Sequence, residues 1–285
     1  MSTSKNLTTR KIKRPTGWVY LLPILVILAL FFVIPVVMLL WRSFSEPNLG
    51  IQHYKELVGS WTYVRVLSNT FIVATTVTVV TVIVGFPVAW ALTIIPNRWA
   101  QYLMAVLLLS MWTNLLVRTY AWMVLLQRTG VINKWLMGMG VIDEPLTLVN
   151  NLIGVTIGMT YIMLPFLILP LHASLQAIDK SILRAAAICG ANQWQIFKSV
   201  LLPLAKPGLA SGALMVFVMS LGYFVTPALL GGTSYMMLAE LIAQLVQSLL
   251  NWGLAGAAAL VLLIVTLGLY ALQLQLIPQS HHQDH

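Results

Sequence analysis

Residues 184–203 read RAAAICGANQWQIFKSVLLP and form the longest polar interruption between apolar stretches in the second half of the chain. Asp179, just before this stretch, can cap a first short helix, because a carboxylate accepts hydrogen bonds from the free N–H groups at a helix start. Gly190 suits the left-handed residue that commonly ends a helix. The stretch therefore predicts a helix, a tight turn and a second helix.

The second helix of this loop has start and stop signals of its own. Asn192 and Gln195 stand at the spacing of a capping box, in which each side chain bonds the backbone N–H of the other residue. Three apolar side chains share one face at helical spacing, namely Trp194, Phe197 and Leu201. Because Pro203 disfavours helical geometry in the residue before it, we expect this helix to stop near Leu202.

The composition points to a membrane protein. Of the 285 residues, 59% are hydrophobic and 8% are charged, whereas soluble domains carry roughly 25% charged residues. No soluble core needs this much apolar surface, so the lipid bilayer is the expected solvent. We expect one transmembrane domain over residues 18–277, flanked by short polar tails at residues 1–17 and 278–285.

Six apolar stretches are long enough to cross a bilayer, which predicts an all-α membrane protein with six transmembrane helices. These stretches are residues 18–41, 67–95, 102–126, 152–171, 207–230 and 252–277. Small residues such as Gly208, Gly212 and Gly222 are expected to let the fifth span pack closely against its neighbours. Residues 233–251 are more polar and are expected to form a short amphipathic helix at the outer interface.

The basic residues set the expected orientation. Ten of the sixteen Lys and Arg residues fall in three segments on one side of the membrane, namely residues 1–17, 96–98 and 174–206. The positive-inside rule makes that side the cytoplasm. Both termini, and the loop between the fourth and fifth spans, are therefore expected in the cytoplasm of a multi-pass inner-membrane protein. The net charge of +9 then reflects topology rather than nucleic-acid binding, although the basic tail could also contact anionic lipid.

The loop motif resembles a known family. The spacing of Ala185-Ala186, Gly190, Val200 and Leu202-Pro203 is similar to the cytoplasmic coupling loop of inner-membrane permeases in binding-protein-dependent ABC importers. That family usually begins the motif with Glu, and this chain has Arg184. The resemblance implies that the loop seats in a cleft of an ATPase subunit. The residues that it assigns to ATPase coupling are Asp179, Arg184, Ala185, Ala186, Gly190, Ala191, Leu202 and Pro203.

The same resemblance implies the partners. They are a second permease chain, two ATPase subunits that bind ATP and Mg²⁺, and an external solute-binding protein, with membrane lipid around the spans. The chain itself lacks the Gly-x4-Gly-Lys-Ser/Thr loop of ATP-binding proteins and the His-Glu-x-x-His zinc motif. Its single cysteine, Cys189, excludes a Cys-rich metal site and is expected to be a small buried residue. We expect a transport subunit without catalytic residue, metal or cofactor of its own.

The third apolar stretch has a polar centre, WTNLLVRTY at residues 112–120. Asn114 and Arg118 stand four residues apart, on one face of a helix. Such a pair is costly in lipid unless it faces protein or water. It either belongs to the substrate pathway or makes an interhelical hydrogen bond while Arg118 extends to the outer interface.

The resemblance extends to a subfamily. The pattern WTN…R.Y, the stretch from Tyr161 to Phe166 and the stretch from Phe224 to Pro227 are similar to the first permease of polyamine importers. Aromatic faces and carboxylates suit an extended polyammonium ligand. The candidate pathway residues are Trp112, Asn114, Arg118, Tyr120, Tyr161, Tyr223, Thr226 and Glu240.

Two alternatives to polyamine import stay open. Glu240 is the only acid in or near the fifth and sixth spans, and it could instead lie on the exposed surface of the short outer helix. Few acids and the positive charge of Arg118 also fit an opine, an aminophosphonate or another small zwitterion. A stand-alone secondary transporter is the alternative mechanism, and a chain that transports without ATP would identify it.

Overall fold

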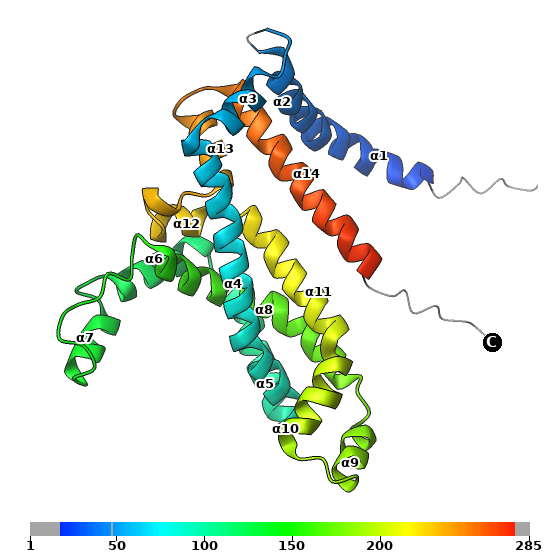
Figure 1. Cartoon of the computed structure of the whole chain (residues 1–285). Coiled ribbons are helices and arrows are strands. Elements are labelled where there is room, and N and C mark those ends of the chain that lie inside the picture. The colour runs from blue at the N-terminus through cyan, green and yellow to red at the C-terminus, as the bar shows by residue number, and fades with distance from the viewer. Residues whose placement is uncertain (1–17, 47, 277–285) are drawn as a thin grey trace, which may run out of the picture.

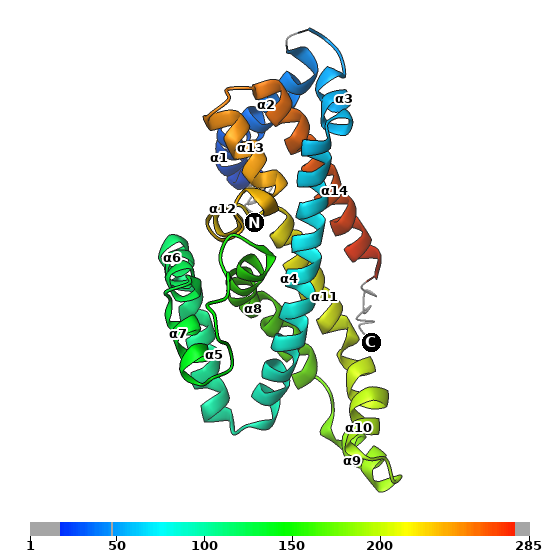
Figure 2. The same ribbon diagram turned by 60° about the vertical axis from the view of Figure 1, so that its left-hand side comes forward.

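The computed structural model describes residues 18–46 and 48–276, and every regular element among them is a helix. Three long helices form the centre, namely α4 (Trp61–Ile94), α8 (Leu152–Gln176) and α11 (Leu202–Leu221). They run side by side and make the most extensive packing contacts of the described residues (Figure 1, Figure 2). The expected second, fourth and fifth spans therefore form one bundle. The expected tails at residues 1–17 and 278–285 lie outside the described residues.

Glycines let these helices approach one another closely. A Cβ atom on Gly208 of α11 would lie 2.3 Å from the Cβ of Ser174 in α8, and one on Gly85 of α4 would lie 2.6 Å from a methyl carbon of Leu167. Contacts this short would force the helices apart, so the packing role expected for Gly208 is confirmed. Gly222 is different, because nothing lies within 4 Å of its Cβ position. It follows the last residue of α11 and has no close neighbour to accommodate.

The first and last spans pack against each other beside this bundle. Three helical segments, α1 (Trp18–Leu28), the π-helical η1 (Ala29–Val33) and α2 (Ile34–Ser45), continue into one rod that packs against α14 (Trp252–Leu276) (Figure 1). A short helix, α3 (Gln52–Gly59), then packs between α14 and α4. The expected first and sixth spans are helical, and the first extends four residues beyond Trp41.

The third expected span is bent, and the expectation of one continuous stretch is wrong. A break at Thr113 and Asn114 separates α5 (Asn97–Trp112) from α6 (Leu115–Leu126), and the chain turns by 100° there. The side chain of Asn114 accepts hydrogen bonds from two N–H groups of α6, so it starts a new helix. The segment after α6 contains a short helix, α7 (Val131–Gly138). With the bent pair taken as one crossing, the described residues hold six candidate spans.

The fifth expected span ends earlier than the sequence indicates. The helix α11 ends at Leu221, and a separate helix, α12 (Val225–Leu230), follows after a turn. The expectation of one span over residues 207–230 is therefore wrong. Apolar residues continue through the turn, so hydropathy does not reveal it. The chain then passes through η3 (Thr233–Tyr235) into α13 (Leu238–Gln247), the short helix that the sequence predicts.

Polar side chains of α4 hold the segment before α13 in place. The amide nitrogen of Asn69 donates to the carbonyl of Ser234 at 2.9 Å, and the N–H of Leu238 donates to the hydroxyl of Thr70 at 2.8 Å. These bonds join residues more than 160 positions apart. They fix the segment against the end of α4 that lies opposite the polar loop (Figure 1).

Candidate functional site

The polar loop folds as two short helices, α9 (Lys180–Ile188) and α10 (Gln193–Ile196), at one end of the bundle (Figure 1). The carboxylate of Asp179 accepts a hydrogen bond from the N–H of Ser181 at 2.8 Å, which caps α9 and holds the pKa of Asp179 below its ordinary value. Gly190 has a φ of +86°. The expected cap and the expected left-handed glycine are both confirmed.

A capping box and an aromatic cluster fix the second helix. Asn192 and Gln195 bond each other's backbone N–H at 2.8 Å in both directions, as expected. The ring of Phe197 meets Phe86 of α4 edge to face at 5.6 Å, and Trp194 stacks on Phe197 at 5.5 Å. The apolar face that the sequence predicts therefore attaches the loop to the end of α4.

The expectation that this helix stops before Pro203 is wrong. The helix α10 runs through a π-helical turn, η2 (Phe197–Leu201), directly into α11. The N–H of Leu202 bonds to the carbonyl of Phe197, five residues back, as a π turn requires. Pro203 then falls in the first turn of α11, where a residue without an N–H is tolerated. The second helix of the loop and the fifth span thus form one continuous helical segment, Gln193–Leu221.

The outer surface of the loop carries small and apolar side chains that no described part of the chain covers. Ile188 is 86% exposed. Cys189 is exposed as well, so the expectation of a buried cysteine is wrong; α9 stands outside the bundle, where nothing packs over its last turn. The eight expected coupling residues divide into an exposed group, Asp179, Arg184, Ala185, Gly190 and Pro203, and a half-buried group, Ala186, Ala191 and Leu202.

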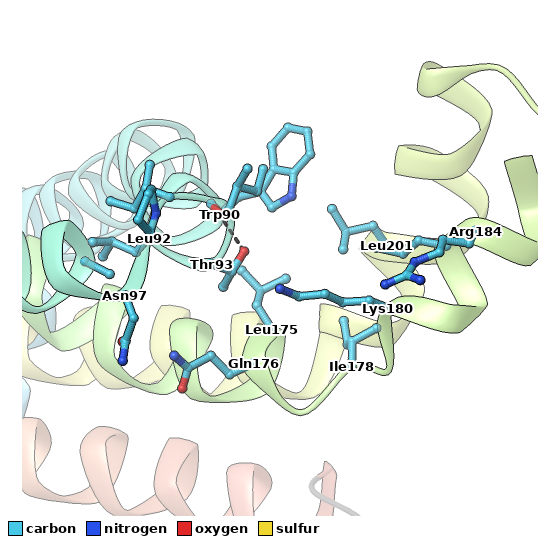
Figure 3. Close-up of a pocket in the computed structure, with 15 residues that line it drawn as sticks. Trp90, Leu92, Thr93, Asn97, Leu175, Gln176, Ile178, Lys180, Arg184 and Leu201 are labelled. Carbon is cyan, nitrogen blue, oxygen red and sulfur yellow. Dashed lines mark hydrogen bonds between the residues drawn. The ribbon is translucent and has the colours of Figure 1, made fainter.

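A cavity of about 860 Å³ lies between α9 and the ends of α4, α5 and α8 (Figure 3). Much of its wall is apolar and includes Trp90, Leu175 and Leu201. Among the described residues, the charged ones that line it are Lys180 and Arg184, one helical turn apart on α9. Arg184 therefore borders this cavity, although the sequence motif assigns it to the surface that meets an ATPase.

A smaller cavity of about 170 Å³ lies among α5, α6, α8 and the end of α11. Two of the eight expected pathway residues, Arg118 and Tyr223, line it. The other lining residues are Met111, Leu115, Ile162, Met163, Phe166 and Met219. The Nε of Arg118 is buried without a hydrogen-bond partner among the described residues. Sequence reasoning did not select the apolar lining, because methionines in a span are ordinarily core residues.

The other expected pathway residues lie outside this cavity. Thr226 of α12 is buried and shares a hydrogen bond of 3.2 Å with the hydroxyl of Thr119 in α6. Tyr161 packs against a tryptophan of α6, with ring centroids 5.8 Å apart. Trp112, at the end of α5, is 90% exposed, and Tyr120 on α6 is also exposed. The structure therefore brings Arg118 and Tyr223 together at one cavity and leaves the other expected residues outside it.

The polar pair expected on one helical face does not form. Asn114 precedes α6 as its cap, and its side-chain oxygen accepts a hydrogen bond from the N–H of Leu116 at 2.9 Å. Its side chain is thus committed to the local backbone, whereas Arg118 reaches the cavity. The two residues share a helix start and not a binding face.

Glu240 lies in the first turn of α13 and is 8% exposed. The alternative that placed it on an exposed outer surface is therefore wrong. Its Oε2 atom is buried without a hydrogen-bond partner among the described residues. Glu240 lines neither of the two cavities described above.

Six candidate crossings, three of them packed as the central bundle, and a capped helical loop at one end are the features of a multi-pass membrane protein. The chain belongs to the binding-protein-dependent transport system inner membrane component family, which matches residues 18–279. It is thus a permease subunit of an ABC importer in the inner membrane, a transport component and not an enzyme, as the loop motif predicts.

Curated relatives and solved structures agree with this family. The chain is 31% identical over 253 residues to the spermidine/putrescine transport system permease protein PotB of Escherichia coli K12, covering 86% of this chain and 91% of that protein. It is 26% identical over 262 residues to PhnU of Salmonella typhimurium, covering 91% of each; the name of that permease assigns it provisionally to 2-aminoethylphosphonate transport. A bacterial alginate ABC transporter solved with a pentasaccharide-bound periplasmic protein matches with a TM-score of 0.73 at 17% identity, covering 90% of this chain and 92% of the other, which confirms the fold.

Proposed function

We propose that this chain forms half of the translocation pathway of an ATP-driven importer for polyamines such as spermidine and putrescine. The observation that carries the proposal is the 31% identity to PotB, which extends over 86% of the chain. A polyammonium ligand is recognised by aromatic faces and carboxylates. Tyr223 at the smaller cavity and the buried Glu240 offer one group of each kind, and a second permease supplies the facing half.

The assembly proposed around this chain contains a second permease, two ATPase subunits and an external solute-binding protein. ATP and Mg²⁺ bind to the ATPase subunits. The loop at residues 174–206 lies in the cytoplasm with both termini, so residues 1–17 and 278–285 form cytoplasmic tails. Exposed Ala185 and the open space around Gly190 support ATPase docking, because small residues let another backbone approach closely.

The continuity of the loop with the fifth span supports the proposed coupling. Because α10 passes through η2 into α11 without a flexible joint, a displacement of α10 is transmitted along α11. The contact of Phe197 with Phe86 carries the same displacement to α4. Closure of the ATPase pair would thus move two of the three central helices, and Tyr223 directly follows the end of α11.

A small zwitterion with an anionic group is the second candidate substrate. Arg118 at the smaller cavity favours it, because a guanidinium pairs with a phosphonate or carboxylate and repels an ammonium group. The similarity to PhnU supports the same class. An opine or another amino-acid-like zwitterion offers the same kind of anionic group.

The test is ATP-driven uptake by proteoliposomes that hold this chain, the subunits that copurify with it and the cognate binding protein. Labelled spermidine, putrescine and 2-aminoethylphosphonate are compared. We expect polyamine uptake, and we expect Glu240→Gln to lower it about tenfold, which corresponds to the loss of one charge-assisted interaction of about 1.4 kcal/mol. Uptake of the phosphonate alone, abolished by Arg118→Gln, would establish the second candidate instead.

Two outcomes contradict the proposal at different levels. ATP hydrolysis without uptake of either polyamine would retain the importer and remove the polyamine. Solute transport by this chain alone, without ATP or any ATPase subunit, would contradict the ATP-driven mechanism. It would identify the chain as a secondary transporter.

A further inference from the structure

The larger cavity, beside the loop, has no part in the proposed substrate pathway. It has a volume of about 860 Å³ and lies where α4 and α8 end and where α5 and α9 begin. Figure 3 shows Lys180 extending from α9 into this space towards Thr93, with Arg184 beside Leu201 at its edge. Since the two cations stand four residues apart on one helix, they face the same space.

Lys180 and Arg184 give the cavity wall positive charge, and no acidic residue shares that wall among the described residues. The two cations form no ion pair in the described part of the chain. Asp179, the neighbouring acid, caps α9 and attracts Arg184 electrostatically, but it forms no ion pair with it and does not line the cavity. Asn97 and Gln176 add side-chain amides that can donate hydrogen bonds. This set of groups suits an anion with several oxygen atoms.

The rest of the wall is apolar and lies at a level marked by aromatic side chains. Leu175 and Ile178 line the cavity together with Trp90. Trp99 and Tyr102, in the first turns of α5, are exposed nearby in the chain. Trp and Tyr gather at the level of lipid headgroups in membrane proteins. The cavity therefore presents cations and apolar surface together, with aromatic side chains of the kind that mark the headgroup level nearby in the chain.

We propose that this cavity binds an anionic phospholipid, with Lys180 and Arg184 pairing with its phosphate and the apolar wall receiving the start of its acyl chains. The cations lie on the face of α9 that borders α4 and α8. Ile182 and Ala185 lie on the other side of the helix and are exposed, so the surface proposed to meet an ATPase stays free. A lipid is favoured over an acidic partner protein for this reason. The proposal is independent of the transported solute.

A lipid in this place would connect the loop to the bundle. The headgroup would contact α9, while the chains would contact the ends of α4 and α8. The lipid would then hold the loop at a fixed distance from the membrane surface. Lys180 and Arg184 would do this through the lipid phosphate and not through an ion pair with another described residue. Membranes that lack anionic lipid would leave these two cations repelling each other.

The experiment measures lipid retention by the full chain together with its copurified subunits. The complex is reconstituted in nanodiscs of phosphatidylglycerol and phosphatidylcholine in equal amounts, extracted into detergent, and its bound lipids are counted by native mass spectrometry. We expect Lys180→Gln and Arg184→Gln each to lower the ratio of retained phosphatidylglycerol to phosphatidylcholine about fivefold. Lys198→Gln is the matched control, because Lys198 is an exposed cation of the same loop that does not line the cavity.

Further variants and a competition with phosphate test whether the two cations bind lipid, an ATPase subunit or free phosphate. Lys180→Arg keeps the charge and is expected to retain the lipid, which separates binding from misfolding. Wild-type retention in the doubly neutralised variant, or an equal loss in Lys198→Gln, overturns the proposal. Loss of the ATPase subunit with lipid retention intact also overturns it and assigns the cations to that partner. Excess inorganic phosphate that fully displaces the lipid overturns it in favour of a free-phosphate site, whereas lipid that persists supports it.

Discussion

The central bundle and the polar loop need glycine for opposite reasons. Gly208 of α11 is required because a Cβ there would lie 2.3 Å from that of Ser174 in α8. Gly190 of the loop has nothing within 4 Å, but its φ of +86° is a conformation that other residues rarely adopt. The bundle is thus specified by contacts within this chain, whereas the loop is specified by backbone conformation and leaves its outer surface uncovered.

This difference separates the residues that hold the fold from those that serve assembly. Substitutions at close-packed bundle positions such as Gly208 act on the stability of the chain itself, because the neighbours they disturb belong to the same chain. Substitutions on the loop disturb few internal contacts, so their main effect is expected on association and coupling. Four sets of substitutions test that separation. Their expected effects on the unfolding free energy decrease from the bundle glycine Gly208 to the hydrogen bond between α6 and α12.

The largest effect is expected from Gly208→Val. The new side chain collides with the Cβ of Ser174 and lies within 2.9 Å of the carbonyl of Pro170, so α8 and α11 must separate. We expect a loss of about 3 kcal/mol, the upper end for an overpacked core. Unfolding in mixed detergent micelles measures it. Gly222→Ala is the control, since Gly222 has a φ of −92° and open space. Wild-type stability of Gly208→Val would show that α8 and α11 are not packed as described.

Gly190→Val is expected to lower the unfolding free energy less than Gly208→Val does. Its main effect is expected on transport. A β-branched residue in the left-handed region costs about 1–2 kcal/mol, but no neighbour is disturbed, so the chain still folds. We expect ATP hydrolysis without coupled uptake, or loss of the ATPase subunit, in proteoliposomes. Gly190→Asn tolerates the same backbone and should retain coupling. Normal assembly and coupled uptake in the Val variant would contradict the proposed role of the loop.

Asn192→Ala is expected to cost about 1 kcal/mol, because it removes the capping box at the start of α10. The readout is the hydrogen-exchange protection of the Gln195 amide, which bonds to the Asn192 side chain. Gln193→Ala serves as the control, since that neighbouring side chain makes no hydrogen bond in the described residues. Unchanged protection at Gln195 would mean that the cap does not limit fraying of this helix.

The smallest effect is expected from the hydrogen bond between Thr119 and Thr226, which joins α6 to α12. Interhelical hydrogen bonds in membranes contribute about 0.6 kcal/mol on average. A double-mutant cycle of Thr119→Val and Thr226→Val isolates it, because Thr119 also bonds within α6 to the carbonyl of Leu115. Strictly additive losses of unfolding free energy in the two single variants would show that this hydrogen bond does not contribute to stability.

The parts of the fold that sequence reasoning predicted well rest on local signals. Three features act within a few residues of the chain, so the local sequence predicts them directly. They are the cap Asp179, the left-handed Gly190 and the capping box of Asn192 with Gln195. The number of spans follows from apolar length. In the candidate site, Arg118 was detectable because a cation in an apolar stretch is rare.

The parts that were missed are of two kinds: breaks and turns of the backbone inside apolar sequence, and burial that depends on what packs over a residue. The turn after Leu221 and the bend at Thr113 occur inside continuous apolar sequence, and apolarity is the same in a straight and a bent segment. The helix also continues past Pro203, because a π turn reroutes the backbone bonds before it. The burial of Glu240 and the exposure of Cys189 were both misjudged, since each depends on what packs over the residue.

The sequence alone determined that the chain is a helical membrane protein with a capped loop, because length, apolarity and capping chemistry are properties of short segments. The permease class came from the resemblance of the loop motif to a known family. Only the tertiary structure decided which residues share a cavity. Arg118 and Tyr223 are more than 100 positions apart in the sequence and line the same cavity. Lys180 shares a cavity with the end of α4 because α8, which precedes it in the chain, ends beside α4. Packing of the bundle sets these distances, and no local pattern in the chain encodes them.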